Sequence, residues 1–528
     1  MTPSWIARRS TLRRVGVVVG AAALTAVASG ARAQTLTYAM NQDIRSTNPG
    51  VNRDGNTDAV TLHMVEGLVG YDAKGVAAPL LARSVQLSPD GRTYTFKLRK
   101  GVKFHNGAEM SSADVLWSWN RYMDPKTQWR CTSEFDGRGA VKVEKVEAPD
   151  AETFVMTIDK PSALFLATLA RFDCGGTAVL HKDSVGADGA WIKPVGTGPF
   201  KLDEWRRGEV VVMSRNASYQ SLPGASDGMV GGKRPLVQTL RFLHVPDAAT
   251  VKAGLLSGAI DIADVDASQV KELKATGKLA IVTAPTAQMH TIILQTKDPL
   301  LANKALRQAI AAALDTTQIV QAVSDGFGVP NNSVVPSASA YYTAVQKQGF
   351  KHDPEKARKL LREAGYKGET IKMLTNKRPI VPSFEVSVIA QAMLQSIGLN
   401  VEIENIEWAT QLERYQKGNY QMQSFSYSAR LDPALGYEAI TGPKAKQPRK
   451  VWDNPQAQAL LDKSMEVTAP AERQKLFDEL HKMQIDEVPI IVLFNNVDFG
   501  AVAKRVKGYA PWFASTPRLW EVSVQSAQ

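Results

Sequence analysis

The stretch from Ala287 to Ile319 constrains the fold most strongly, because a buried strand there leads directly into a helix near the middle of the chain. Residues Thr291–Leu294 are β-branched or apolar, as a strand covered on both faces requires. After Pro299, Asn303 can cap a helix in which apolar side chains recur every three or four residues, at Leu306, Ile310, Ala313 and Leu314. The stretch therefore predicts a strand and a helix of a buried α/β core.

Helices and strands alternate through the rest of the second half. A helix is expected over Val386–Ile397, between strands at Ile371–Leu374 and Leu399–Ile403. Short links between such elements favour right-handed crossovers and a mainly parallel sheet. The helix expected over Ala471–Met483 and the strand expected over Pro489–Phe494 repeat the same step.

The first half is richer in strands. Thr35–Met40 and Thr93–Leu98 alternate in hydrophobicity, as half-buried strands do. Val60–Tyr71 has the pattern of a helix. Ser111, with Asp114 three residues later, has the capping-box pattern and predicts the start of another helix.

Length and charge limit the function classes. A chain of 528 residues exceeds what a single hydrophobic core usually holds, so we expect two or more domains. The first 33 residues contain 5 Arg and no acid, which leaves 58 basic against 52 acidic residues, a net charge of +6. This excess is small, and Lys and Arg do not cluster with interleaved aromatic residues. Nucleic-acid binding is therefore not expected.

Residues 1–33 have the pattern of a cleaved signal peptide. Four arginines precede an apolar run over Val15–Val27, and Ala31-Arg32-Ala33 gives an A-x-A cleavage site. The apolar run is too short to span a bilayer, so stable membrane insertion is not expected. Arg8 and Arg9 partly resemble a twin-arginine signal, and both that route and the Sec route to the periplasm stay open.

Cys131 and Cys174 are the only cysteines of the chain. In the oxidising periplasm they could form one disulfide, and two buried thiols are the alternative. Neither cysteine has partners at the spacing of a zinc site. No metal and no cofactor are expected.

The motifs of common enzymes are missing from the sequence. The seven His are scattered, and neither G-x-S-x-G nor H-E-x-x-H occurs. Gly196 and Gly198 lead into Pro199 and Phe200 rather than into the Lys and helix of a phosphate-binding loop. A binding protein is favoured over an enzyme, although a hydrolase whose triad is assembled from distant residues stays open.

Three stretches resemble one family of extracytoplasmic proteins. Asn303–Asp315 reads NKALRQAIAAALD, Pro194–Tyr219 contains GTGPF, WRRG and RNASY, and residues 67–125 run from GLVGYD to RYMDP. All three are similar to the solute-binding proteins of the peptide and nickel class (family 5, cluster C), which serve ABC importers. The resemblance extends from about Thr35 to the C-terminus.

This resemblance implies an α/β fold similar to that of the type II periplasmic binding proteins. Two lobes would be joined by crossover strands, and an extra subdomain would be inserted in lobe I. The expected order is a signal peptide over 1–33, lobe I over 34–75, the inserted subdomain over 76–193, lobe I over 194–285, lobe II over 286–495 and lobe I over 496–528.

The resemblance also implies the function. The protein is expected to capture a small solute, peptide-like or otherwise anionic or amphiphilic, by closing its lobes, and to deliver it to a membrane permease. Its expected partners are the solute and the permease subunits of an ABC transporter, and a monomer is expected. The alternatives are a nickel- or metal-chelate-binding member of the same family and, from other classes, a periplasmic hydrolase or a chaperone-like holdase.

The segment Ser424–Tyr437, SFSYSARLDPALGY, resembles the family's cleft segment. In peptide-binding members an acid shortly before the D-P pair binds the ligand's amino group. Here Ala429 stands at that place and Arg430 follows, and a guanidinium suits a carboxylate or phosphate. We therefore expect an anionic group on the ligand, with pairing of Arg430 to Asp432 or to another acid as the alternative. Tyr427 is expected to be an aromatic wall of the pocket.

Seven further residues are candidates for ligand contact. The resemblance puts the first three beside the cleft or the ligand, and the other four lie in a loop after a strand, in an irregular segment or at the crossover. They are Trp408, Asn41 and Arg171, followed by Arg378, His290, Trp129 and Arg130.

Overall fold

The computed structural model describes residues 34–52, 54–139, 141–377 and 381–525. The expected signal peptide therefore lies outside the described residues. Within the described part of the chain, no helix is both long enough and apolar enough to cross a membrane.

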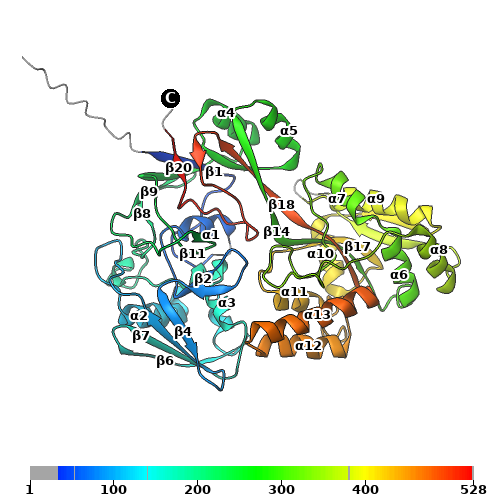
Figure 1. The fold of residues 1–528 in the computed structure, drawn as a ribbon, viewed down its shortest axis with the longest axis horizontal. Coiled ribbons are helices and arrows are strands. Elements are labelled where there is room, and N and C mark those ends of the chain that lie inside the picture. The colour runs from blue at the N-terminus through cyan, green and yellow to red at the C-terminus, as the bar shows by residue number, and fades with distance from the viewer. Residues whose placement is uncertain (1–33, 53, 140, 378–380, 526–528) are drawn as a thin grey trace, which may run out of the picture. The chain divides into compact units, whose positions relative to one another are not determined.

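A ten-stranded sheet organises the protein, in the order β16-β15-β17-β14-β18-β13-β1-β12-β9-β8. The β1 flank of this sheet consists of β13 (Ile262–Val265), β1 (Thr35–Met40), β12 (Thr239–His244), β9 (Val210–Arg215) and β8 (Phe200–Arg206). The β17 flank consists of β17 (Met422–Tyr427), β15 (Ile371–Thr375) and β16 (Val401–Asn405). Between the flanks lie β14 (Leu279–Leu294) and β18 (Ile490–Ala503), which Figure 1 shows side by side.

The strands β14 and β18 are the crossover strands that the sequence predicts. They pair antiparallel from Leu279 opposite Ala503 to Ile293 opposite Ile490, with an irregularity between Pro285 and Met289. The early part of β14 and the late part of β18 lie beside the β1 flank, and their other halves lie beside the β17 flank. Two neighbouring strands thus carry the chain from one flank to the other and back.

Eight helices with described bounds belong to the β17 flank. They are α6 (Lys304–Ala313), α7 (Thr316–Val323), α8 (Pro354–Glu363), α9 (Ser383–Ser396), α10 (Trp408–Lys417), α11 (Pro433–Ile440), α12 (Pro455–Glu466) and α13 (Pro470–Glu487). Asn303 caps α6 as expected, its side chain accepting hydrogen bonds from the backbone N–H groups of Ala305 and Leu306. The apolar stripe of α6 packs into a core that includes Ile292 of β14, so the predicted strand and helix share one core.

The parallel pairing that the sequence predicts is also present. β15 pairs parallel with β16, and α9 connects the two strands. β15 also pairs parallel with β17 on its other side.

The β1 flank carries a second sheet, of four strands in the order β4-β5-β7-β6. Its strands are β4 (Ala82–Leu87), β5 (Thr93–Leu98), β7 (Thr153–Ile158) and β6 (Val143–Asp150). Helix α2 (Ser112–Met123) begins with the expected capping box between Ser111 and Asp114.

Shorter elements complete the β1 flank. The helices are α1 (Gly55–Thr61), α3 (Phe165–Leu169), α4 (Ala248–Ser257) and α5 (Ala267–Ala275), and the 3₁₀ turns are η1 (Pro125–Thr127), η2 (Thr132–Glu134), η3 (Phe172–Thr177) and η4 (Lys182–Ser184). The short strands are β2 (Val69–Tyr71), β3 (Ala77–Pro79), β10 (Ser226–Asp227), β11 (Val230–Gly231), β19 (Val506–Lys507) and β20 (Ser523–Val524).

The helix expected over Val60–Tyr71 is wrong. α1 ends at Thr61, and Val69–Tyr71 forms β2, which pairs antiparallel with β3. At Gly67 the backbone approaches another chain segment so closely that an added Cβ would lie 2.0 Å from the carbonyl oxygen of Gly176. Tertiary pairing thus overrides a helical pattern that is only local.

Candidate functional site

The candidate site lies where the carboxyl ends of both sets of parallel strands meet. On the β1 flank, β13 ends at Val265, opposite Phe499 of β18. On the β17 flank, β17 ends at Tyr427, opposite Met289 of β14. Both ends point to the middle of the two crossover strands, and ligands of α/β sheets bind outside the carboxyl ends of the strands. We call this region the junction.

An acidic pair stands on the β1 side of the junction. Asp264, on β13, accepts a hydrogen bond of 2.6 Å from the hydroxyl of Tyr38 on β1. Desolvation raises the pKa of Asp264, and its hydrogen bond with Tyr38 opposes that rise. Desolvation also raises the pKa of Asp498, on β18, to about 6, and the charge of Asp264 adds to that rise.

A charged network is fixed by a disulfide in the same flank. Cys131 and Cys174 are joined, with a Cα–Cα distance of 5.6 Å, which decides between the two alternatives that the sequence left open. Their neighbours Arg130 and Asp173 form an ion pair of 2.7 Å. Because the disulfide ties the two segments together, it holds this pair in place.

Arg171 completes the network. Its guanidinium binds Asp173 through two hydrogen bonds of 3.0 and 2.9 Å and Glu134 through one of 2.8 Å. Beside this network lies Asp58 of α1, which is 6% exposed. Desolvation raises the pKa of Asp58 to about 8, and the charge of Asp173 adds to the rise. Asp58 is therefore protonated at neutral pH.

The β17 side of the junction is held by a buried ion pair. Asp432 accepts hydrogen bonds from Arg473 of α13 at 2.9 and 2.8 Å, and both side chains are at most 8% exposed. Asp432 also caps α11 by accepting the N–H of Ala434 at 2.9 Å. The hydroxyl of Tyr341 accepts a further hydrogen bond from Arg473 at 3.1 Å. The pair fixes the loop that joins β17 to α11.

Segments of both flanks touch at the junction. The N–H of Ala340 donates to the carbonyl oxygen of Lys74 at 3.3 Å. Gly75 has a φ of +78°, and a Cβ there would lie 2.6 Å from the ring of Phe513 and 3.4 Å from Leu431. The turn at Gly75 is packed between Leu431, in the loop of the β17 flank, and Phe513, in the C-terminal segment. A side chain at this position would clash with the ring of Phe513, so only glycine fits.

Several sequence candidates lie in or beside these networks. Arg130 and Arg171 occur together, bound to Asp173. Arg430 is exposed on the loop before Asp432, and its Nη1 donates to the carbonyl oxygen of Ala429 at 3.0 Å. Asp432, the alternative partner named for Arg430, is instead engaged by Arg473.

Other candidates are packed into cores. Tyr427 is 8% exposed, and its hydroxyl lies 3.3 Å from that of Tyr415. His290, on β14, is fully buried and its ring meets that of Phe494 edge to face. Trp129 is 3% exposed, and its Nε1 donates to the carbonyl oxygen of Cys174 at 3.0 Å. All three side chains are therefore buried.

The last three candidates have different surroundings. Trp408 begins α10, half-buried, with its ring 5.5 Å from that of Phe425. Asn41 is exposed just after β1 and accepts a hydrogen bond from Asn56 at 3.5 Å. Arg378 lies outside the described residues.

Residues that sequence reasoning missed include Asp264, Asp498, Asp58 and Arg473. Asp264 could have been predicted from the sequence, because it lies at the carboxyl end of the short strand in SGAIDIADV. Arg473 could not have been predicted in this way, since its partner Asp432 lies 41 residues away in the sequence.

The described residues offer one group of possible metal ligands, Cys131, Asp173 and Cys174. Both sulfur atoms are bonded to each other, so neither can act as a thiolate ligand. This group does not fit a metal site.

Comparisons with known proteins agree with this architecture. The family model described as bacterial extracellular solute-binding proteins, family 5 (middle), matches residues 77–447. The dipeptide-binding protein of Escherichia coli (strain K12) is 26% identical over 530 residues, covering 95% of this chain and 97% of that protein. Heme-binding protein A of Haemophilus influenzae is 28% identical over 464 residues, covering 82% of this chain and 81% of that protein.

A solved structure gives the same picture. The structure of HbpA2 from Haemophilus parasuis superposes with a TM-score of 0.81 at 25% sequence identity, covering 93% of this chain and 100% of that chain.

Proposed function

Since this chain belongs to the bacterial extracellular solute-binding proteins of family 5, we propose that it captures a small solute outside the cytoplasm and delivers it unchanged to the permease of an ABC importer. The observation that carries the proposal is the crossover of β14 and β18 between the two flanks of the sheet. A pair of strands that links two halves can bend as a hinge, and bound solute then favours the closed form.

The proposed lobes follow the two flanks. Lobe I comprises 34–75, 194–285 and 496–528, with the subdomain 76–193 inserted, and lobe II comprises 286–495. Residues 1–33 are proposed to direct export to the periplasm and to be removed there. The mature protein acts as a monomer and has no catalytic role.

We propose that the solute is peptide-like or a related amphiphilic compound with an anionic group. Relatives named for a dipeptide and for heme support this range, since both compounds carry carboxylates. Arg430 is the proposed anion contact, because it is exposed on the loop that follows the carboxyl end of β17. Asp264 and Asp498 are proposed to face the polar or cationic part of the solute.

The test uses the mature chain, residues 34–528. Native mass spectrometry of protein purified without denaturation should reveal a retained small molecule. A thermal-shift screen of dipeptides, tripeptides and heme should then identify a stabilising class, because a ligand at a hundred times its Kd adds about 2.7 kcal/mol of stability.

Three outcomes of this test would count against the proposal. Chemical conversion of the bound compound would indicate a hydrolase. Binding of unfolded chains but of no small compound would indicate a holdase. Failure to retain or bind any member of the panel would remove the proposed solute class.

A further inference from the structure

A pocket lies in the β17 flank, at the opposite end of its strands from the junction. It has a volume of about 540 Å³. It is lined where β14 ends and where β15 and β17 begin, and its charged side chains are Lys297, Asp298, Lys372, Arg414, Lys417 and Lys444. Tyr427 marks the other end of β17 and does not line this pocket, so the pocket, which we call the distal pocket, is separate from the candidate site.

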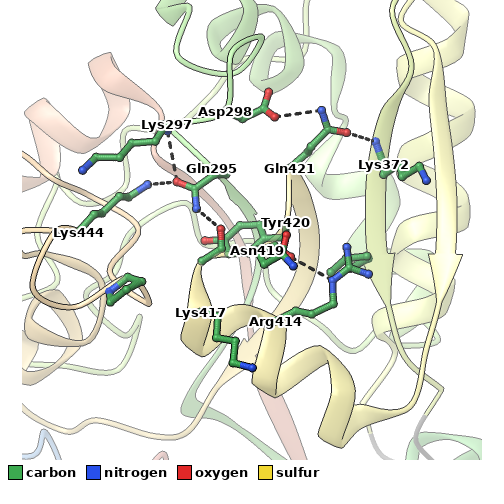
Figure 2. Close-up of a pocket in the computed structure, with 13 residues that line it drawn as sticks. Gln295, Lys297, Asp298, Lys372, Arg414, Lys417, Asn419, Tyr420, Gln421 and Lys444 are labelled. Atoms are coloured by element: carbon green, nitrogen blue, oxygen red, sulfur yellow. Dashed lines mark hydrogen bonds between the residues drawn. The ribbon is translucent and has the colours of Figure 1, made fainter.

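Cations dominate the lining of the distal pocket. Its five basic side chains face one acid, Asp298. Asp298 is already engaged, because its Oδ1 accepts the N–H groups of Leu300 and Leu301 and its Oδ2 accepts the amide of Gln421 at 3.1 Å. Figure 2 shows the last of these contacts at the rim of the pocket.

Three of the five cations form ion pairs with carboxylates of residues that do not line the pocket. Lys297 lies 3.2 Å from Asp453, Arg414 lies 2.7 Å from Glu404 and Lys417 lies 2.6 Å from Glu413. The other two are Lys372 and Lys444, and no carboxylate of the described residues lies within ion-pair distance of either side chain. The five cations therefore exceed the four nearby carboxylates, Asp298, Asp453, Glu404 and Glu413, by one charge, and Lys372 and Lys444 are the two that form no ion pair of their own among the described residues.

Lys444 is the unusual member, since its residue is only 5% exposed. Its Nζ donates to the hydroxyl of Thr296 at 2.8 Å and to the side-chain oxygen of Gln295, both neutral acceptors. Figure 2 shows the ammonium directed at Gln295. An ammonium has three donors, and these described partners take two of them.

Burying an ammonium without a counter-charge is costly. Desolvation lowers the pKa of Lys444 to about 8, and the charges of Lys297 and Arg307 lower it further, whereas the charge of Asp453 opposes the shift. An anion in the pocket would reverse this cost, because it supplies both a counter-charge and an acceptor for the third N–H.

We propose that the distal pocket binds a small multivalent oxyanion, a phosphate-bearing or polycarboxylate compound. Lys444 donates its third N–H to the anion from the floor of the pocket. Lys372, which is exposed at the start of β15, contributes a second cation that forms no ion pair among the described residues. The volume admits a compound larger than a single ion, since small-molecule sites usually fall between about 300 and 1,000 Å³.

The test is isothermal titration calorimetry of the mature protein with inorganic pyrophosphate and, separately, with citrate, in a low-salt buffer at pH 7. Pyrophosphate binding alone would assign the pocket to phosphate-bearing compounds, and citrate binding alone to polycarboxylates. In either case Lys444→Met should weaken binding at least tenfold and Lys372→Gln should weaken it several-fold. Lys482→Gln, on the exposed side of α13, serves as the control and should leave the affinity unchanged.

The affinity of the distal pocket for the anion should also depend on pH. Since Lys444 must be protonated to hold the anion, affinity for citrate, whose carboxyls ionise below pH 7, should fall as the pH rises from 7 to 9, and this fall should be absent from Lys444→Met. Absence of binding for both probes would overturn the proposal. So would binding that is equally strong in the wild type, Lys372→Gln and a folded Lys444→Met variant.

Discussion

Arg473 and Asp432 form a buried pair in which Nη1 of the guanidinium donates to Oδ2 of the carboxylate at 2.9 Å and Nη2 donates to Oδ1 at 2.8 Å. The pair joins α13 to the loop that leads from the end of β17 into α11. That loop carries Arg430, the proposed anion contact. A structural ion pair thus positions the segment on which recognition of the solute depends.

Removing Arg473 should therefore destabilise the fold. Arg473→Met leaves the carboxylate of Asp432 buried without its cation, which costs about 3–5 kcal/mol of unfolding free energy. Arg473→Lys should recover only part of this loss, because an ammonium cannot form the two parallel hydrogen bonds. Urea unfolding of the mature protein measures both changes.

The exposed pair of Arg358 with Glu355 on α8 provides the control. Arg358→Met should change the unfolding free energy by less than about 1 kcal/mol, since surface ion pairs contribute little. Equal losses for Arg358→Met and Arg473→Met would contradict the assigned importance of the buried pair.

The disulfide predicts a second stability effect. Cys131 and Cys174 are 43 residues apart, and closing a loop of that length in the unfolded chain contributes about 4 kcal/mol. Cys131→Ser combined with Cys174→Ser should lower the urea midpoint accordingly. Reductant should lower the midpoint of the wild type in the same way and leave that of the double variant unchanged. A reductant effect on the double variant would show that another process is being measured.

Replacing Arg430 should weaken binding of the solute. If its guanidinium holds an anionic group of the solute, Arg430→Ala should weaken binding of a carboxylate-bearing ligand roughly tenfold or more, the range of a charge-assisted hydrogen bond. Because Arg430 is exposed, the unfolding free energy should change little. Calorimetric titration with the ligand found by native mass spectrometry provides the measurement.

The control for this experiment is Arg362→Ala, which removes an exposed arginine from α8. Its affinity for the ligand should equal that of the wild type. If Arg430→Ala also binds with wild-type affinity, Arg430 does not contact the solute.

Much of the fold follows from local patterns. The segment Thr35–Met40 and the cap at Asn303 were predictable because alternation and capping depend only on near neighbours. Thr291–Leu294 was also predicted as a strand, but it is the last quarter of the 16-residue β14. The earlier part of β14 contains Pro285 and polar residues, and pairing with β18 decides its structure.

The site was less predictable, because its contacts join distant positions. Arg130 and Arg171 were candidates separately, and only folding brings them to the same Asp173. Trp129 was a candidate for its type, but an aromatic side chain in an irregular segment can equally fill a core, as this one does. Burial and pairing across long separations are the information that a sequence pattern lacks.

Asp58 makes the stability depend on pH. Desolvation raises the pKa of its carboxyl to about 8, whereas the pKa of an unfolded aspartate is about 3.9. Between these two pH values the folded protein binds more protons than the unfolded chain, so the unfolding free energy should fall as the pH rises from 5 to 8. Asp58→Asn cannot ionise and should remove this part of the slope.

The expected result is that Asp58→Asn has a flatter pH dependence and exceeds the wild type in unfolding free energy at pH 8 by more than about 1 kcal/mol. Urea unfolding at pH 5, 6, 7 and 8 measures the slope. Asp90→Asn is the matched control, because hydrogen bonds from Ser88 and from the N–H of Arg92 lower the pKa of Asp90 and its titration ends below this range. The slope of the control should equal that of the wild type. A slope that persists in Asp58→Asn would mean that another group, such as Asp498 with its pKa of about 6, dominates the titration.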